Sequence, residues 1–252
     1  MAFSPETRAA GAPPRSPPSI LVYAVLFDID GTLVQTGGAG QLAFAETFAA
    51  EFGVPALSGA VSFAGRSDRA IAQELMRVHG VEPSDANWQR FRSAYLEVLP
   101  GALRRRQGRV LPGVTSLLTA LGAVERSVVG LLTGNVREGA ARKLRYYGLA
   151  DHFPFGGFGD DTDERCEIAS MALAEARRFA AGRNGHTSEL AGVMVIGDTE
   201  HDIRCARSIG AVAVAVPTGG ATREVLAAAQ PDLLLDDLSD ARPLLELIAG
   251  GK

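Results

Sequence analysis

Apolar and polar positions alternate along the chain in two recurring patterns. Short apolar runs have the length and composition of buried strands, and the segments between them repeat apolar residues at the three- and four-residue spacing of helices. Five such runs occur, at residues 20–27, 127–132, 192–196, 212–216 and 233–235. This alternation predicts an α/β fold, a Rossmann-like three-layer core in which helices cover both faces of a parallel sheet of about five strands.

The interval between the first two runs differs from the rest of the chain. Residues 37–109 show helical spacing without a strong strand pattern. Such a block is far longer than an ordinary connection between a strand and a helix. We therefore expect a small all-helical domain over 37–109, inserted into a core formed by 21–36 and 110–252.

The first 20 residues contain five prolines and no apolar period, which predicts a disordered tail over 1–20. The apolar run that follows is too short to span a membrane. It is followed by aspartates and not by the small residues of a cleavage site. We expect neither a membrane association nor a secretory signal.

Composition narrows the class of protein further. A hydrophobic content of 46% over 252 residues is that of a globular chain, and a net charge of -4 argues against binding to nucleic acid. Cys166 and Cys205 lie far apart with no CxxC spacing, which indicates neither a disulfide framework nor a zinc site. A reducing, cytoplasmic setting is expected, and nothing in the sequence favours one oligomeric state.

Two aspartates directly follow the first apolar run. Asp28 and Asp30 stand at alternate positions, so both begin on one face of the strand. Two carboxylates this close require a cation, a shared proton or separation. Alternatively, Asp28 and Asp30 merely end the strand and cap a turn, because Asp-Gly is a common turn pair.

Polar residues also follow two later runs. Thr133-Gly134-Asn135 offers a hydroxyl, backbone N–H groups and a helix N-terminus, which together suit a phosphate, although these residues equally suit a simple helix cap. Asp198 and Asp202 lie one helical turn apart, so both can face one hard cation. Ligands of such sheets bind beyond the carboxyl ends of the strands.

With these motifs the chain resembles the haloacid dehalogenase-like hydrolase superfamily over about residues 22–247. The first family motif, DxDGT, corresponds to 28–32, the second to Thr133, and the fourth, GDxxxD, to 197–202. The third motif usually supplies a lysine, which is missing between Lys143 and the fourth motif. Arg165 is the expected substitute, and Lys143, inside the helix after Thr133, is the rival.

The resemblance implies a Mg²⁺-dependent reaction through an aspartyl-phosphate. Asp28 would be the nucleophile and Asp30 the general acid and base. The implied Mg²⁺ ligands are the side chains of Asp28 and Asp198 and the backbone carbonyl of Asp30, with Asp202 supporting the site from outside the ligand set. The implied phosphate-binding residues are Thr133, Gly134, Asn135 and Arg165.

Further features of the resemblance concern the substrate. Dehalogenases lack the second aspartate, so Asp30 favours a phosphatase acting on a small phosphorylated metabolite. The insert 37–109 matches an alpha-helical cap, and Gly65-Arg66-Ser67-Asp68 resembles the phosphoglycolate phosphatase-like branch. Arg66 would contact the substrate or, alternatively, pair with Asp68. Two other functions remain open, a phosphomutase of the same superfamily and a non-catalytic binding or regulatory module on the same fold.

Overall fold

The computed structural model describes residues 21–184 and 189–250, so the predicted tail 1–20 lies outside the described residues. Its centre is a six-stranded sheet in the order β5-β4-β1-β6-β7-β8, in which all neighbouring strands run parallel. The strands are β1 (Val22–Phe27), β4 (Ser127–Leu132), β5 (Gly156–Gly157), β6 (Leu190–Gly197), β7 (Val212–Ala215) and β8 (Leu233–Leu234).

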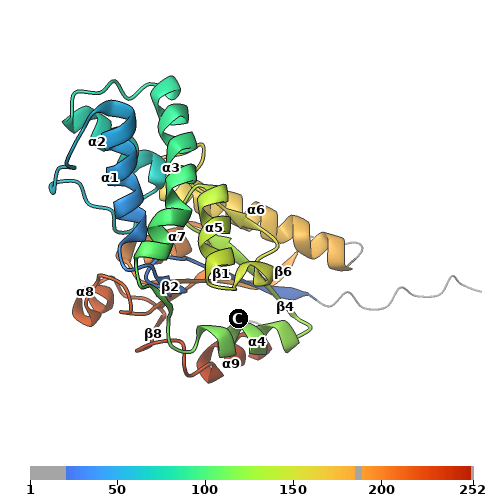
Figure 1. Cartoon of the computed structure of the whole chain (residues 1–252). Helices are drawn as coiled ribbons and strands as arrows, with labels where there is room; N and C mark the ends of the chain where they lie inside the picture. The colour runs from blue at the N-terminus through green and yellow to red at the C-terminus, as the bar shows by residue number, and fades with distance from the viewer. Residues whose placement is uncertain (1–20, 185–188, 251–252) are drawn as a thin grey trace, which may run out of the picture.

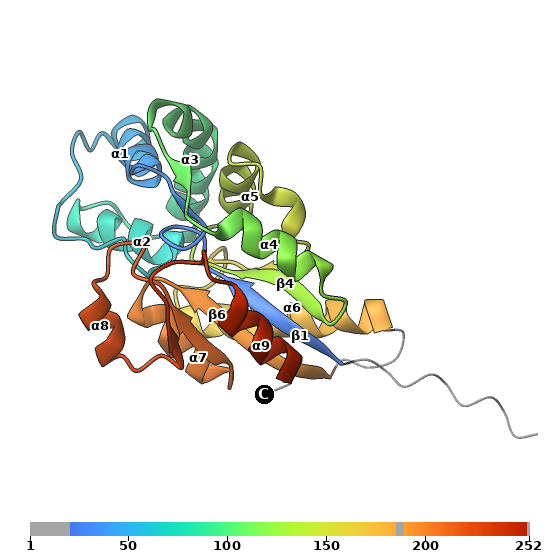
Figure 2. The same ribbon diagram turned by 90° about the horizontal axis from the view of Figure 1, so that it is seen from below.

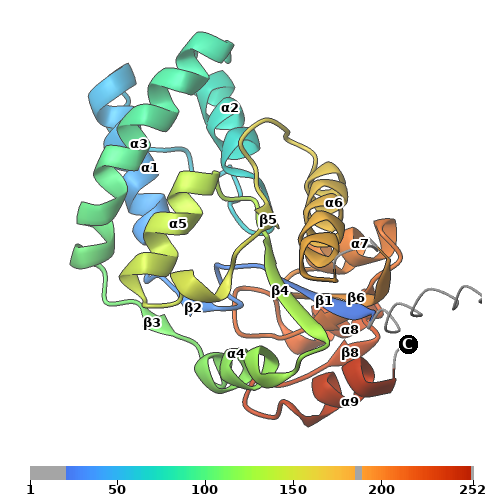
Figure 3. The same cartoon turned by 90° about the vertical axis from the view of Figure 1, so that its right-hand side faces the viewer.

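Helices cover both faces of the sheet, as predicted (Figures 1 and 3). One face packs on α4 (Val114–Ala123), α5 (Arg137–Tyr146) and α9 (Arg242–Gly250), the other on α6 (Arg165–Asn184), α7 (Glu200–Ser208) and α8 (Arg223–Ala228). Strand β1 shows why: Tyr23, Val25 and Phe27 enter the first hydrophobic cluster, and Val22, Ala24 and Leu26 enter the second. This two-sided burial produces the continuous apolar run of a central parallel strand.

The sheet has one strand more than the sequence pattern indicated. Strand β5 consists of Gly156 and Gly157 alone, and two glycines carry no hydrophobic pattern from which a strand could be predicted. Gly156 and Gly157 pair with Leu131 and Leu132 of β4. A Cβ at Gly157 would lie 2.4 Å from the carbonyl oxygen of Ile168, so close packing against α6 requires glycine there.

Three helices form a separate layer at one end of the sheet, which we call the helical cap (Figures 1 and 2). They are α1 (Ala39–Phe52), α2 (Asp68–Val78) and α3 (Asp85–Arg105). Their own hydrophobic cluster is rich in aromatic residues, including Phe44, Phe48, Trp88, Phe91 and Tyr95. A short antiparallel ribbon of β2 (Val34–Gln35) and β3 (Arg109–Val110) links the cap to the core. The sequence did not predict this ribbon, because two-residue strands are too short to show a period.

None of the helices in the described ranges is both long and apolar enough to cross a membrane.

Candidate active site

Three neighbouring strands deliver polar residues to the same edge of the sheet. Asp28 directly follows β1, Thr133 directly follows β4, and Asp198 directly follows β6. Because β4, β1 and β6 are adjacent and parallel, their carboxyl ends meet, and the three side chains gather beneath the helical cap. A cavity of about 450 Å³ lies between this edge and the cap. The structure thus brings together the residues that the sequence analysis singled out.

Three carboxylates lie at the base of the site. Asp28, Asp198 and Asp202 are buried, and each offers an oxygen within 4.8 Å of the others. Burial, followed by the charge of Asp202, raises the pKa of Asp28 to about 7 and that of Asp198 to about 8. Ionised carboxylates this close repel one another in a buried site, and a divalent cation would offset that repulsion. Carboxylate oxygens are also the hard donors that such a cation prefers.

Glycines make room for Asp198. A Cβ at Gly219 would lie 1.7 Å from Oδ2 of Asp198, and one at Gly31 would lie 2.4 Å from the same atom. Gly31 also has a φ of 89°, which a residue with a side chain rarely adopts. The hydroxyl of Thr32 donates to Oδ1 of Asp198 at 3.3 Å. The carboxylate is therefore enclosed by backbone on one side and oriented by a hydroxyl on the other.

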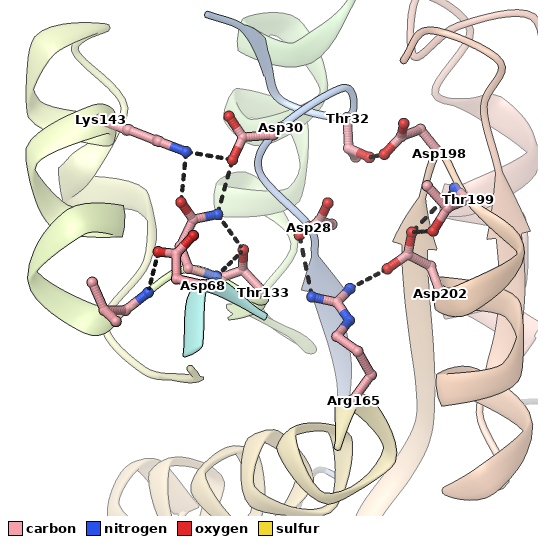
Figure 4. Close-up of polar contacts among 12 residues, drawn as sticks. Asp28, Asp30, Thr32, Asp68, Thr133, Lys143, Arg165, Asp198, Thr199 and Asp202 are labelled. Atoms are coloured by element: carbon pink, nitrogen blue, oxygen red, sulfur yellow. Dashed lines mark hydrogen bonds and ion pairs between the residues drawn. The ribbon is translucent and has the colours of Figure 1, made fainter. Parts of the chain in front are cut away.

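Arg165 lies between two of the three aspartates (Figure 4). Its Nη1 is 3.9 Å from Oδ1 of Asp28, and its Nη2 donates to Oδ1 of Asp202 at 2.5 Å. Burial alone would lower the pKa of Arg165, but Asp202 and Asp28 outweigh burial and raise it. The guanidinium is thus a fixed cation next to Asp28, where the family's third motif is expected to supply a positive charge.

Both carboxylate oxygens of Asp202 accept hydrogen bonds from protein groups. Its Oδ2 accepts from the backbone N–H of Thr199 at 3.1 Å and from the Thr199 hydroxyl at 2.7 Å, while Arg165 takes Oδ1. These bonds cap α7 and hold Arg165 in place. Asp202 thus contacts Arg165 and Thr199, an arrangement compatible with the expectation that it supports the site from outside the ligand set.

Asp30 belongs to a second polar network on the other side of the site. Its Oδ2 accepts from Nζ of Lys143 at 2.5 Å and from Nδ2 of Asn135 at 2.9 Å. Lys143 also donates to Oδ1 of Asn135 at 2.6 Å, and Nδ2 of Asn135 donates to the Thr133 hydroxyl at 2.9 Å. Thr133 accepts in this network, so its own hydroxyl proton is available for a further acceptor.

The sequence pattern suggested Lys143 only as the rival to Arg165 for the third motif, and its contact with Asp30 was not predicted. The side chain is buried, and it reaches Asp30 and not Asp28. A signal was present in the sequence, because Lys143 is one of only two lysines in a chain that otherwise uses arginine, the other being Lys252. It also follows the buried Ala140 at helical spacing, on the inward face of α5.

Arg66 does not pair with Asp68, which corrects the alternative raised from the sequence. Arg66 forms an ion pair with Glu74 at 2.5 Å and lines the cavity. Asp68 instead turns into the core, where its Oδ2 accepts from the backbone N–H of Val136 at 2.9 Å. Burial raises the pKa of Asp68 to about 6, against the opposing charge of Lys143. Sequence reasoning did not single out Asp68 for its own role.

Comparisons with known proteins identify the family. The model of the haloacid dehalogenase-like hydrolases matches residues 25–216. The chain belongs to this family. It is 31% identical over 234 residues to the phosphoglycolate phosphatase of Synechococcus elongatus, covering 87% of this chain and 95% of that protein. It is 26% identical over 231 residues to the phosphoglycolate phosphatase of Pectobacterium atrosepticum, covering 89% and 92%.

Solved structures agree on the fold. CbbY from Rhodobacter sphaeroides in complex with phosphate superposes with a TM-score of 0.67 at 20% identity, covering 87% of this chain and 96% of that one. A predicted phosphoglycolate phosphatase from Haemophilus somnus gives 0.65 at 19% identity, covering 90% and 98%. The family model and the sequence relatives assign the chain to the phosphatases of the family, in the phosphoglycolate phosphatase-like branch.

Proposed function

We propose that the chain is a Mg²⁺-dependent phosphatase that hydrolyses a small phosphate monoester through an aspartyl-phosphate at Asp28. The observation that carries this proposal is the position of Asp28, buried at the end of β1 between the Asp198 carboxylate and the Arg165 guanidinium. An anionic nucleophile attacks a phosphate dianion only where fixed positive charge offsets their repulsion. Arg165 supplies one such charge.

The first half-reaction transfers the phosphoryl group to the protein. A carboxylate oxygen of Asp28 forms a bond to phosphorus while the bond from phosphorus to the ester oxygen breaks. Asp30 donates a proton to the departing alkoxide, which leaves as the alcohol. The hydroxyl of Thr133, the backbone of Gly134 and Asn135, and Arg165 hold the phosphate oxygens.

The second half-reaction restores Asp28. Asp30, now ionised, takes a proton from a water molecule that attacks phosphorus, and the bond from Asp28 to phosphorus breaks. Lys143 and Asn135 both donate to Oδ2 of Asp30, and no hydrogen bond within the described ranges reaches Oδ1. We assign the proton transfers to Oδ1, because Asp30 lines the cavity where the substrate would bind.

The donor set fits Mg²⁺, a hard cation that prefers oxygen ligands. Asp28 and Asp198 would hold it through their side chains and Asp30 through its backbone carbonyl, whereas Asp202 already has its oxygens engaged by Thr199 and Arg165. When bound, Mg²⁺ supplies positive charge that neutralises the phosphate.

We propose a small phosphorylated metabolite as substrate. The relatives named phosphoglycolate phosphatases suggest a phosphorylated carboxylic acid, and the cavity of about 450 Å³ suits a small molecule. Arg66 lines the cavity from the helical cap, and we propose it as the contact for the substrate carboxylate.

We further propose that residues 37–109 act as one cap over this cavity, with the glycines of 37–40 as a hinge. Closure of such a cap would exclude water other than the hydrolytic one.

We also propose the cytoplasmic setting expected from the sequence, which the free thiols of both cysteines support.

A panel of small phosphate monoesters tests the proposed function. The parent protein and Asp28→Asn are assayed for inorganic phosphate with Mg²⁺ and with a chelator. The proposal predicts phosphate release that requires both Mg²⁺ and Asp28. Rearranged products without phosphate release would indicate a phosphomutase, and no reaction of the parent with any ester would indicate a non-catalytic module.

A further inference from the structure

Asp68 stands at the start of a helix that it does not cap. It is the first residue of α2 in the helical cap, and α2 is already capped by Ser67, whose hydroxyl accepts from the backbone N–H of Ala70 at 3.2 Å. The buried carboxylate of Asp68 instead crosses to the core (Figure 4). It accepts from the N–H of Val136 at 2.9 Å, and its own backbone N–H donates to the carbonyl of Gly134 at 2.7 Å.

The helix that receives these bonds cannot cap itself. The N-cap position of α5 is Val136, whose side chain has no acceptor. Its first two N–H groups are satisfied by carboxylates from elsewhere, Val136 by Asp68 and Arg137 by Asp160 at 2.7 Å. Asp160 in turn pairs at 2.8 Å with Arg92 of α3. Both acceptors at the start of α5 are therefore held by, or tied to, the helical cap.

Residues of the candidate site lie before α5 and within it. Thr133, Gly134 and Asn135 directly precede it, and Lys143, two turns along it, holds Asp30. The cap and the turn at 133–135 also pack closely, because a Cβ at Gly134 would lie 2.1 Å from the carbonyl oxygen of Arg66. The backbone at 66–68 of the cap is therefore in direct contact with the turn at 133–135.

We propose that Asp68 is a positioning residue that couples the seating of the helical cap to the order of the phosphate-binding turn 133–135, by completing the N-terminus of α5 from the opposite domain. This inference rests on the proposed function. Asp68 touches no reacting atom in this role. It acts through Val136 and Gly134, so that the turn is fully ordered only while the cap is seated on the core.

Two substitutions of Asp68 test the contact, and the chain offers a matched control. Asp68→Ala removes the acceptor, whereas Asp68→Asn keeps an acceptor oxygen without the charge. Asp85 follows the N-cap Ser84 of α3 just as Asp68 follows Ser67, but its side chain is 86% exposed. Asp85→Ala therefore reproduces the loss of an acid from the first turn of a helix without disturbing the core.

The expected result is a loss in kcat. With an ester that the parent hydrolyses, Asp68→Ala should lower kcat about 10- to 100-fold, the scale of a slightly misplaced site. Asp68→Asn should restore kcat to within about threefold of the parent, because the N–H of Val136 regains an acceptor. Asp85→Ala should leave kcat unchanged. Equal losses in the Ala and Asn variants, or a loss in Asp85→Ala equal to that in Asp68→Ala, would overturn the proposal.

A third variant removes the other partner and covers the case in which Asp68→Ala does not fold. Val136 has a φ of -63°, the value that a proline ring fixes, so Val136→Pro deletes the donor while keeping the backbone angle. Its kcat should fall as in Asp68→Ala. The double variant should lose no more than either single one, because both remove the same bond. Additive losses would overturn the proposal.

A readout independent of turnover separates this inference from the proposed function. Hydrogen exchange at the amides of 134–140 is compared in the parent, Asp68→Ala and Asp85→Ala. Faster exchange confined to Asp68→Ala supports the coupling, and unchanged exchange overturns it. A parent that hydrolyses no ester would refute the proposed function, and the exchange comparison would still decide whether Asp68 orders the turn.

Discussion

Nζ of Lys143 lies 2.5 Å from Oδ2 of Asp30, although 113 positions separate the two residues in the chain. The same ammonium donates to Oδ1 of Asn135 at 2.6 Å. One buried cation of α5 thus fixes the proposed acid and base and the phosphate-binding turn relative to each other. Its burial makes the contact costly to break, because Asp30 would lose its cation in a partly desolvated site.

Lys143→Met should therefore lower kcat about 10- to 100-fold, since general acid and base catalysis depends on the position of Asp30. Steady-state kinetics of purified variants measure this. Arg145→Met is the control, because Arg145 lies on the same helix with a side chain 63% exposed and pairs only loosely with Glu138 at 3.6 Å. If Lys143→Met behaved like Arg145→Met, the ammonium would have no part in the reaction.

Arg165 should be needed for both stability and turnover. Arg165→Met removes the partner of the buried Asp202 and Asp28, and should lower the free energy of unfolding by about 3 to 5 kcal/mol. Arg165→Lys keeps the charge but not the planar fork, so it should retain more stability and only part of the activity. Denaturant titration and kcat measure the two effects. The exposed Arg178 of the same helix supplies the control variant Arg178→Met, and a result for Arg165→Met matching that control would contradict the assignment.

Two adjacent glycines test the cation site without changing a proposed ligand. A Cβ at Gly219 would lie 1.7 Å from Oδ2 of Asp198, whereas one at Gly220 would meet nothing within 4 Å. Gly219→Ala should displace the carboxylate and weaken Mg²⁺ binding about 10- to 100-fold, as changes just outside a ligand set do. Gly220→Ala should bind Mg²⁺ like the parent. Titration calorimetry with Mg²⁺ alone measures both, and equal affinities would remove Asp198 from the site.

The acidic cluster also predicts how stability changes with pH. Burial raises the pKa of Asp28 to about 7 and that of Asp198 to about 8, from the ordinary aspartate pKa of 3.8. At a pH between the ordinary aspartate pKa and these raised values, the folded protein holds protons that the unfolded chain has released. The free energy of unfolding without metal therefore falls as pH rises toward about 8. A bound cation replaces those protons, and Mg²⁺ should therefore stabilise the protein more at about pH 8 than at about pH 5.5.

Thermal unfolding at both pH values, with Mg²⁺ and with a chelator, checks this expectation. Asp198→Asn removes one of the two titrating groups, so the pH dependence of the Mg²⁺ effect should become smaller. A shift in Tm by Mg²⁺ that is the same at both pH values, or larger at the lower one, would contradict the proposed link between protons and the cation.

The strand ends were the part of the molecule that the sequence predicted best. Residues such as Asp28 and Asp198 follow long apolar strands, and parallel pairing then requires that they meet at one edge. The three-layer core was confirmed for the same reason, because β1, β4 and β6 are buried on both faces and read as continuous apolar runs.

Features that depend on tertiary contact were missed. Strand β5 consists of two glycines, and what defines it is space beside α6, which leaves no hydrophobic pattern. Asp68 follows an N-cap serine as the first residue of its helix, and Asp85 does the same, so this local pattern does not distinguish the two acids. Only the fold shows that one of these carboxylates faces the core and the other faces solvent. The local sequence pattern predicts that a residue lies in a helix, but it does not predict which other helix packs against that residue.

The most direct test of the central claim is the capture of phosphate on Asp28. The parent protein with Mg²⁺ is mixed with an ester that it hydrolyses and whose phosphorus is labelled. The reaction is stopped rapidly with acid, and the labelled residue is located by peptide mapping. The account predicts label on the peptide that contains Asp28, and none in Asp28→Asn, whose phosphate release should fall by roughly a thousandfold or more. Label on another residue, or phosphate release that persists in Asp28→Asn at the rate of the parent, would contradict it.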